Sequence, residues 1–139
     1  MAKLKPILYW LDVTSCVIWA VIMLLYGHRG VRFYAGLTMA AVAFPFWMTA
    51  RIQLGRSFSV TAKARELVTT GLYSKFRNPI YLFGGMTFLG LAIAWSNLIG
   101  WIYVLPTVPM QFLRIRKEEA VLERAFGEKY RVYKARTWF

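Results

Sequence analysis

The chain has 139 residues, of which 58% are hydrophobic and 17% are charged, and it carries a formal net charge of +12. Soluble domains are usually about half apolar and about a quarter charged, so this composition predicts an integral membrane protein with a single domain, residues 1–139. The basic residues gather beside the apolar segments, where they are typical of topology signals and of contact with anionic headgroups. Because no nucleic-acid motif accompanies them, we expect membrane lipids and no nucleic acid as partners.

Four apolar segments predict an all-α bundle of about four transmembrane helices, followed by a cytoplasmic amphipathic helix. They cover residues 7–26, 33–50, 80–95 and 98–113. The first two are long enough to cross a hydrocarbon core of about 30 Å. The last two have 16 residues each and reach only about 24 Å. Because only Ser96-Asn97 separates them, they predict a tight helical hairpin with extended ends or a locally thinned membrane.

Several residues inside these segments depart from a plain apolar helix. Pro45 is expected to kink the second segment, and Pro106 and Pro109 are expected to distort the fourth near its end. Asp12 lies five residues into the first segment, where an acid is costly and often functional. It is also near enough to the end to reach the headgroups, so its role stays open. Three glycines of the third segment are expected to allow close helix contact: Gly84, Gly85 and Gly90.

The distribution of Lys and Arg predicts the topology. Two basic residues precede the first segment, two lie in the first loop, six in residues 51–79, none in the third loop and eight in residues 114–139. Four spans therefore place 16 of the 18 basic residues on one side, which the positive-inside rule makes cytoplasmic. Both termini, the loop 51–79 and the tail 114–139 are then expected on the cytoplasmic side, where loop and tail can form one site.

Arg77-Asn78-Pro79 opens the third segment and has two interpretations. In the first, Asn78 caps the helix, Pro79 occupies its first turn and Arg77 meets headgroups. In the second, the free N–H groups and the positive end of the helix dipole also bind a ligand carboxylate. Tyr73 and Tyr81 can stack on an adenine or close over a cation, although interfacial aromatic residues often anchor in the headgroups instead.

The tail from Arg114 to about Tyr133 has the spacing of a helix with one apolar stripe. The stripe consists of Ile115, Leu122, Phe126, Tyr130 and Tyr133. Glu119 falls near the centre of a gap in this stripe and Glu118 on its flank, with Arg114 four residues earlier. Glu118 and Glu119 either belong to a solvated helix face with surface ion pairs, or they are buried. In the second case the cost of burying their charge is compensated by a ribose hydroxyl, an amino group or a sulfonium. Phe126-Gly127 can break this helix, so the continuity of the stripe beyond that point stays open.

The chain offers few groups for covalent or metal chemistry. Its single cysteine, Cys16, lies in an apolar segment, and its single histidine, His28, is predicted on the outer side. One cysteine excludes an internal disulfide, and the absence of a Cys/His cluster argues against a metal site and against a Ser/His or Cys/His nucleophile. Carboxylates, arginines and aromatic side chains remain, a set that suits the binding of a polar cofactor.

Two motifs lie in the second half of the chain. The first is Gly71-x-Tyr73-x-x-x-Arg77-Asn78-Pro79-x-Tyr81, and the second is Glu118-Glu119-x-x-Leu122-x-x-x-Phe126-Gly127-x-x-Tyr130-x-x-Tyr133. Together, with an apolar hairpin between them, they resemble the integral membrane methyltransferases of the isoprenylcysteine carboxyl methyltransferase and phospholipid methyltransferase family. The chain departs from the prenylcysteine enzymes at Asn78, where those have His, and in this it is similar to lipid-methylating and bacterial members.

The resemblance implies an S-adenosylmethionine-dependent methyltransferase, in the inner membrane of a bacterium. The acceptor would be lipophilic, either isoprenylcysteine carboxylate-like or phospholipid amine-like. Arg114, Glu118 and Glu119 are the implied catalytic residues, and Arg114 would face the acceptor. The implied cofactor-binding residues are Glu66, Leu67, Val68, Tyr73, Arg77, Asn78, Pro79, Tyr81 and Glu118.

Two other functions remain open from the sequence. Membrane reductases of the sterol-reductase type are similar in their C-terminal halves and use NADPH, but we identify no basic cluster for a 2′-phosphate that is separable from the topology charges. A non-catalytic membrane subunit is the other alternative, and the presence of Arg77, Glu118 and Glu119 argues against it. The oligomeric state and the acceptor do not follow from the sequence.

Overall fold

The computed structural model describes residues 4–55 and 67–139, apart from the side chains of residues 4–10 and 12. The described part is helical, with no β-sheet, which confirms the all-α prediction. Its elements are α1 (Leu4–Tyr26), α2 (Val31–Leu54), the short 3-10 helix η2 (Gly71–Ser74), α3 (Pro79–Trp95), α4 (Leu98–Phe126) and α5 (Glu128–Arg136). The side chain of Asp12 lies outside this description, so its role stays open.

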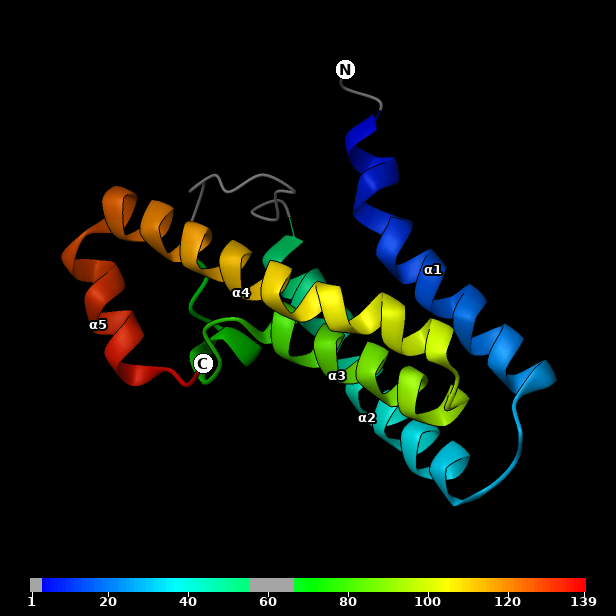
Figure 1. Ribbon diagram of the computed structural model, residues 1–139. Coiled ribbons are helices and arrows are strands. Elements are labelled where there is room, and N and C mark those ends of the chain that lie inside the picture. The colour runs from blue at the N-terminus through cyan, green and yellow to red at the C-terminus, as the bar shows by residue number, and fades with distance from the viewer. Residues whose placement is uncertain (1–3, 56–66) are drawn as a thin grey trace.

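Helix α3 runs antiparallel to both α2 and α4, and α1 lies obliquely at their side (Figure 1). The closest pair is α2 and α3, because small residues face each other where the two helices cross. A Cβ atom on Gly36 would collide with the backbone of Gly90 and Ala94, and one on Gly90 would collide with Gly36 and Ala40. The expected role of a small residue in close helix contact is therefore confirmed for Gly90 of the third segment.

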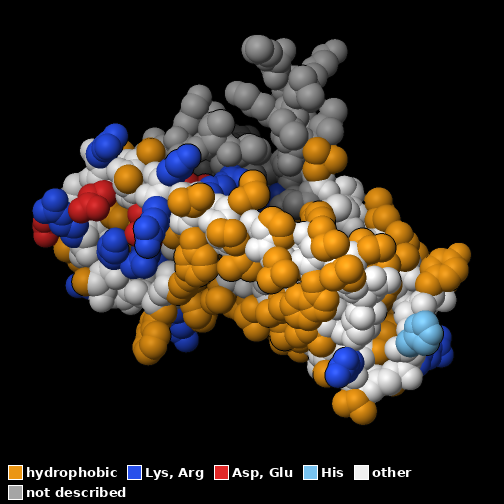
Figure 2. Space-filling model, in the orientation of Figure 1, with side chains coloured by type: hydrophobic (Ala, Val, Ile, Leu, Met, Phe, Trp, Pro, Cys, Tyr) orange, Lys and Arg blue, Asp and Glu red, His pale blue; other side chains and the backbone are white. Residues whose placement is uncertain are grey.

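The apolar residues divide between a small core and a large exposed surface. The core is formed by Val13, Cys16, Met23, Phe33, Ala40, Trp47, Leu91 and Ala94. Many large apolar side chains of α1 and α4 are exposed, including Ile18, Leu25, Leu98, Ile102, Leu105 and Leu113. They form a continuous apolar surface, whereas the acidic and many basic residues gather at one end, over α5 and the end of α4, and further basic residues lie beside the histidine at the other end (Figure 2). Apolar surface of this extent is typical of a lipid-facing bundle.

Two of the helices, α2 and α4, are long and apolar enough to cross a membrane, judged by length and composition. The described apolar part of α1, Val13–Tyr26, and the whole of α3 are shorter. The hairpin between the last two segments has the expected form, because Ser96 adopts a left-handed conformation and the Asn97 side chain accepts a hydrogen bond from the Ile99 amide. The prediction of about four spans is thus supported for two helices and stays a prediction for the other two.

The fourth apolar segment and the first part of the predicted tail helix form one continuous helix. Helix α4 runs past residue 113 to Phe126, so the tail begins as an extension of the predicted span. Both prolines of this segment, like Pro45 in α2, lie inside helices that continue through them. The break falls at Gly127, where a φ of 49° ends α4 and α5 begins in a new direction.

Candidate functional site

The start of α3 and the second half of α4 lie at the same end of the bundle, because the two helices are antiparallel (Figure 1). The chain then reverses at Gly127, and α5 brings the last residues back to the turn before α3. There the Trp138 amide donates to the Lys75 carbonyl at 2.7 Å, and the Arg77 amide donates to the Trp138 carbonyl at 2.8 Å. The tail therefore covers the Arg77-Asn78-Pro79 turn, and the two sequence motifs form one site.

The first motif is fixed by its glycine. Gly71 has a φ of 61°, a left-handed conformation that favours glycine, and a Cβ atom there would also displace the end of the Gln53 side chain. The Gln53 side chain accepts a hydrogen bond from the Leu72 amide at 2.7 Å, which attaches η2 to the end of α2. On the other side, the Tyr133 hydroxyl donates to the Tyr73 carbonyl at 2.8 Å and attaches η2 to α5.

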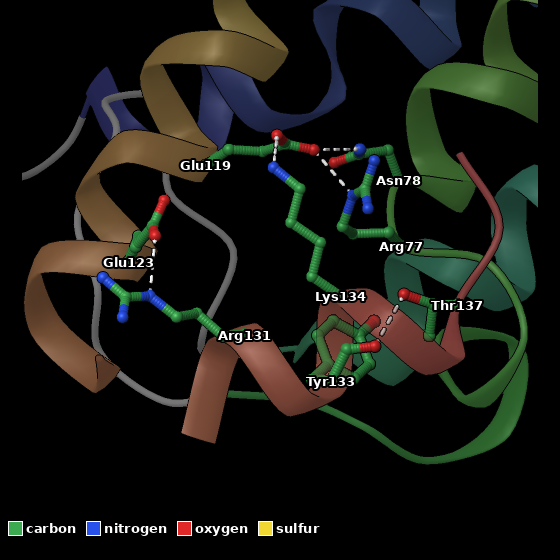
Figure 3. Close-up of polar contacts among 8 residues, drawn as sticks. All are labelled: Arg77, Asn78, Glu119, Glu123, Arg131, Tyr133, Lys134 and Thr137. Carbon is green, nitrogen blue, oxygen red and sulfur yellow. Dashed lines mark hydrogen bonds and ion pairs between the residues drawn. The ribbon is translucent and has the colours of Figure 1, made fainter. Parts of the chain in front are cut away.

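Glu119 lies at the centre of a polar cluster (Figure 3). Its Oε1 is 2.6 Å from Nε of Arg77 and 3.5 Å from Nδ2 of Asn78, and its Oε2 accepts a hydrogen bond from Nζ of Lys134 at 3.0 Å. These partners come from the turn before α3 and from α5, and the Glu119 side chain is only 17% exposed. The carboxylate therefore joins three separate parts of the chain.

The electrostatic state of Glu119 follows from these contacts. Burial raises the pKa of Glu119, but the hydrogen bond from Lys134, the charges of Arg77 and Lys134, and the hydrogen bond from Asn78 outweigh it, so the pKa is lowered from its ordinary value. Glu119 lies on the part of α4 beyond the predicted span and is charged at neutral pH.

Glu118 has a different set of partners. Its Oε1 accepts hydrogen bonds from the Tyr81 hydroxyl at 2.6 Å and from Nε of Arg114 at 3.0 Å. The Arg114 guanidinium lies 5.7 Å from the centroid of the Tyr81 ring, which is a cation–π arrangement. The two neighbouring carboxylates thus separate: Glu119 contacts the turn and α5, and Glu118 contacts the first turn of α3.

One predicted role in the turn is wrong. Asn78 occupies the N-cap position of α3 and Pro79 begins the helix, as expected, but the Asn78 side chain makes no capping hydrogen bond. Its amide group is directed to Glu119 instead, and the Asn78 carbonyl accepts from the amides of Tyr81 and Leu82. The Asn78 amide N–H donates to the carbonyl of Phe139 at 2.9 Å. The tail backbone therefore lies against the start of α3.

The structure brings six of the residues named from the sequence into one cluster. They are Arg77, Asn78, Tyr81, Arg114, Glu118 and Glu119. Tyr73 and Pro79 are buried beside it, and Leu67 and Val68 are half-buried in the segment that leads to η2. Glu66 lies outside the described residues.

Three residues at this end of the molecule were not found by sequence reasoning. The sequence marks Lys134 only as a topology charge and Arg51 only as a loop charge, and it places Tyr130 in the apolar stripe and the second motif without a role in the site. Arg51 is buried at the end of α2, with its guanidinium 5.4 Å from the centroid of the Trp47 ring. A basic residue in the last turn of an apolar helix, four residues after a tryptophan, was the signal available for Arg51.

Tyr130 and Tyr133 close the site from α5 with their rings 6.1 Å apart. Burial raises the pKa of Tyr133 to about 12, and it also raises the pKa of Tyr130, so both phenols are neutral. The Tyr130 hydroxyl is buried and has no hydrogen-bond partner in residues 4–55 and 67–139. Nε of Arg77 is close to Glu119, but within the same residues no acceptor meets hydrogen-bond geometry for its N–H. The Tyr130 hydroxyl is therefore a buried donor that a bound polar molecule could engage.

The site therefore combines two carboxylates, two guanidinium groups, a lysine and several phenols next to a lipid-facing surface. Within the described part of the chain, no group of three His, Cys, Asp or Glu side chains could hold a metal ion. This set of side chains can bind and orient a charged polar molecule, but it contains no activated nucleophile of the Ser/His or Cys/His kind.

Comparison with known proteins gives one match. A family model described as phospholipid methyltransferase matches residues 31–129, more than half of the chain. The matched stretch contains α2, the whole first motif and both glutamates, and it stops before Tyr130, Tyr133 and Lys134 of α5. No curated protein and no solved structure matches the chain.

Proposed function

Because the chain belongs to the phospholipid methyltransferase family of membrane methyltransferases, we propose that it transfers a methyl group from S-adenosylmethionine to a lipophilic acceptor at the cytoplasmic membrane face. The acceptor is an isoprenylcysteine carboxylate or a phospholipid amine. The protein is expected in a bacterial inner membrane, with four spans and both termini cytoplasmic.

The observation that carries this proposal is the contact between two motifs about 40 residues apart in the chain. Arg77 and Asn78 of the first motif lie against Glu119 of the second, and Tyr81 lies against Glu118. Surface ion pairs contribute little to stability, and nothing in helix packing alone requires so many half-buried charged groups in one place. A concentration of this kind at one end of an apolar bundle is typical of a binding site.

The side chains of the site fit the chemical groups of S-adenosylmethionine. Arg77 and the buried Tyr130 hydroxyl offer donors that the cofactor's carboxylate or ribose oxygens would accept. Glu118 and Glu119 offer negative charge to its ammonium and sulfonium groups, and the Tyr73 and Tyr81 rings, with Leu67 and Val68, offer surfaces for the adenine. Glu66 and Pro79 complete the proposed cofactor-binding set.

The cofactor supplies an activated methyl group, so the reaction requires no covalent enzyme intermediate and no metal. The protein's task is alignment and the exclusion of water. Glu118 holds Arg114 beside Tyr81, at the lipid-facing edge of the cluster, where Arg114 meets the polar group of the acceptor. The tail, pinned by the backbone hydrogen bonds of Trp138 and Phe139, covers the site from the aqueous side.

Ligand binding to the detergent-purified protein tests the proposal against the reductase alternative. We expect calorimetry to show saturable binding of S-adenosylmethionine, with S-adenosylhomocysteine as a competitor. Saturable binding of NADPH, with neither of the two sulfur compounds binding, would replace methyl transfer by reduction. Binding of none of the three would favour a non-catalytic membrane subunit.

A further inference from the structure

A polar side chain, Gln111, lies on α4 within the segment 98–113 that is predicted to span the membrane. It is half-buried, and its amide makes no hydrogen bond to any residue in the described part of the chain. An amide group without a partner in an apolar environment is costly, and polar side chains at such depth usually meet another helix or a ligand. The amide of Gln111 is therefore available to a partner other than the described residues.

The side chain of Gln111 is directed towards α3. Its Oε1 lies 3.3 Å from the position that a Cβ atom on Gly85 would occupy, and no other described atom outside the immediate surroundings of Gly85 lies within 4 Å of that position. Gly85 consequently leaves space beside the amide of Gln111. A methyl group at residue 85 would reduce that space.

Gln111 is also continuous with the polar cluster. Gln111, Arg114 and Glu118 follow at steps of three and four residues and therefore share one face of α4. On α3, Tyr81 and Gly85 form the facing column, with Tyr81 opposite Arg114 and Glu118 and Gly85 opposite Gln111. Gln111 thus extends the polar face of α4 by about one helical turn, roughly 5 Å, into the apolar part of the bundle.

We propose that Gln111 and Gly85 form a subsite for the polar group of the acceptor, below Arg114 and open to the bilayer. The ligand is an amphiphile with an anionic oxygen, either a phosphodiester or a carboxylate. This oxygen accepts a hydrogen bond from the Gln111 amide, close to the positive charge of Arg114. The subsite rests on the proposed methyl transfer and adds to it a residue that sets how deeply the acceptor is held.

Thr107 provides a matched control on the same face of α4, one turn deeper than Gln111. Its hydroxyl donates to the Val104 carbonyl at 2.7 Å, so its hydrogen-bonding capacity is used within its own helix. Thr107→Val therefore removes a hydroxyl group that is already bonded within its own helix and is not available to a ligand. Gln111→Leu removes an available amide at similar size.

Steady-state methyl transfer and cofactor calorimetry test the subsite in the full-length protein. We expect Gln111→Leu to raise the KM for the acceptor by roughly three- to tenfold, which is the usual value of one hydrogen bond, and to leave the affinity for S-adenosylmethionine unchanged. Gly85→Ala should raise the same KM, because its methyl group competes with the acceptor for space. Thr107→Val should behave like the wild type. Wild-type KM in both Gln111→Leu and Gly85→Ala would overturn the proposal.

Lipid retention gives a second readout that does not depend on turnover. Native mass spectrometry of the purified variants is run with dioleoyl phosphatidylethanolamine in one arm and S-farnesylcysteine in the other, which distinguishes a phosphodiester from a carboxylate. We expect Gln111→Leu to retain several-fold less of one of these probes than Thr107→Val does.

The same measurement separates this proposal from the function on which it rests. If the wild type binds no S-adenosylmethionine but Gln111→Leu still loses the probe, the methyl transfer fails and the subsite stands. Equal retention of both probes by Gln111→Leu and Thr107→Val would refute the subsite. If the wild type is a dimer and Gln111→Leu is a monomer with unchanged probe retention, Gln111 is a contact between two copies of the chain, and this result would also refute the subsite.

Discussion

At the scale of single residues, Glu118 and Glu119 are neighbours in sequence with separate partners in space. Glu118 is held by Tyr81 and Arg114, and Glu119 by Arg77, Asn78 and Lys134. The sequence placed one carboxylate near the centre of the apolar stripe and one on its flank, and their side chains are 17% and 24% exposed, in that order. Neighbouring carboxylates on a helix can therefore serve different tasks.

The contacts of the cluster predict one effect for variants of the two glutamates and another for a variant of Arg114. Glu119→Gln should weaken S-adenosylmethionine binding by about 1.5–3 kcal/mol, because hydrogen bonds to a charged group are stronger than those to a neutral amide. Glu118→Gln should weaken it in the same direction. Arg114→Ala is the matched control, because we place the Arg114 side chain beside the acceptor. This variant should leave cofactor affinity nearly intact and raise the KM for the acceptor. Wild-type behaviour of all three in calorimetry and in methyl transfer to a lipid extract would show that the cluster is only a solvated helix end.

Asn78 shows what the sequence cannot predict at this scale. Its position at the start of α3 follows from the Asn-Pro pair, but its side chain bonds to Glu119, 41 residues away, instead of capping the helix. A local preference for capping lost to a tertiary contact, which no local pattern reveals. The contact of Lys134 with Glu119 could not be predicted for the same reason, because the turn at Gly127 ends the helical periodicity that relates α4 to the tail.

The revised role of Asn78 changes the expected effect of substitution. Asn78→His should keep cofactor affinity, because imidazole can also donate a hydrogen bond to Glu119. Asn78→Leu should weaken cofactor binding by only about 0.5–1.5 kcal/mol, since the contact to Glu119 is long and no helix cap is lost. Calorimetry of the two variants against the wild type measures the difference. A much larger loss in Asn78→Leu would mean that Asn78 contacts the cofactor directly.

At the scale of secondary-structure elements, the first motif depends on how η2 is attached to α2. The positive φ of Gly71 and its contact with Gln53 predict that Gly71→Ala lowers the free energy of unfolding by about 1–3 kcal/mol. Gly30→Ala is the matched control, because Gly30 has an extended backbone with no described atom near its Cβ position. Thermal unfolding in detergent compares the two, and equal midpoints would show that η2 adjusts without strain.

The attachment of α5 should depend on pH. The folded state lowers the pKa of Glu119, so the contribution of Glu119 to stability is fully present above its ordinary pKa of 4.5 and is lost as the pH falls below that value. We expect hydrogen exchange of α5 amides to accelerate, relative to those of α2, between about pH 5 and pH 3. In Glu119→Gln this difference should disappear. An α5 that exchanges alike in both proteins across this range would show that the Tyr133 and Trp138 contacts hold it without Glu119.

The helices themselves were largely predictable because apolar periodicity and the Asn-Pro and Ser-Asn pairs mark their ends. A helix over residues 114–126 was also predicted, but its unbroken continuation from the fourth segment was not, because the change from apolar to charged residues marks the predicted membrane boundary rather than the end of a helix. Arg51 was also missed, since its burial depends on the packing of α2 against its neighbours. Sequence therefore located the motifs, and packing determined which of their side chains meet.

At the scale of the whole molecule, the site requires that the loop before α3 and the tail lie on one side of the membrane. The two possible arrangements differ in whether they meet this requirement. Four spans meet it, and they place His28 outside, Ser96 outside and Lys129 inside. If only α2 and α4 cross, as their length and composition support, the loop before α3 and the tail lie on opposite sides, with His28 and Lys129 on one side and Ser96 on the other.

Cysteine labelling from outside intact cells decides between these arrangements, in a Cys16→Ser background with single cysteines at His28, Ser96 and Lys129, all of which are exposed. The four-span arrangement places 16 of the 18 basic residues on the cytoplasmic side, as the positive-inside rule requires. We therefore expect a membrane-impermeant maleimide to label positions 28 and 96, and to label position 129 only after the cells are permeabilised. Equal labelling at 28 and 129, with 96 protected, would establish two spans and leave α3 as a buried helix. Labelling at position 129 alone would show that the protein has the inverted orientation. The polar cluster would then lie on the outer face, out of reach of a cytosolic cofactor, and the proposed function would fail together with the topology.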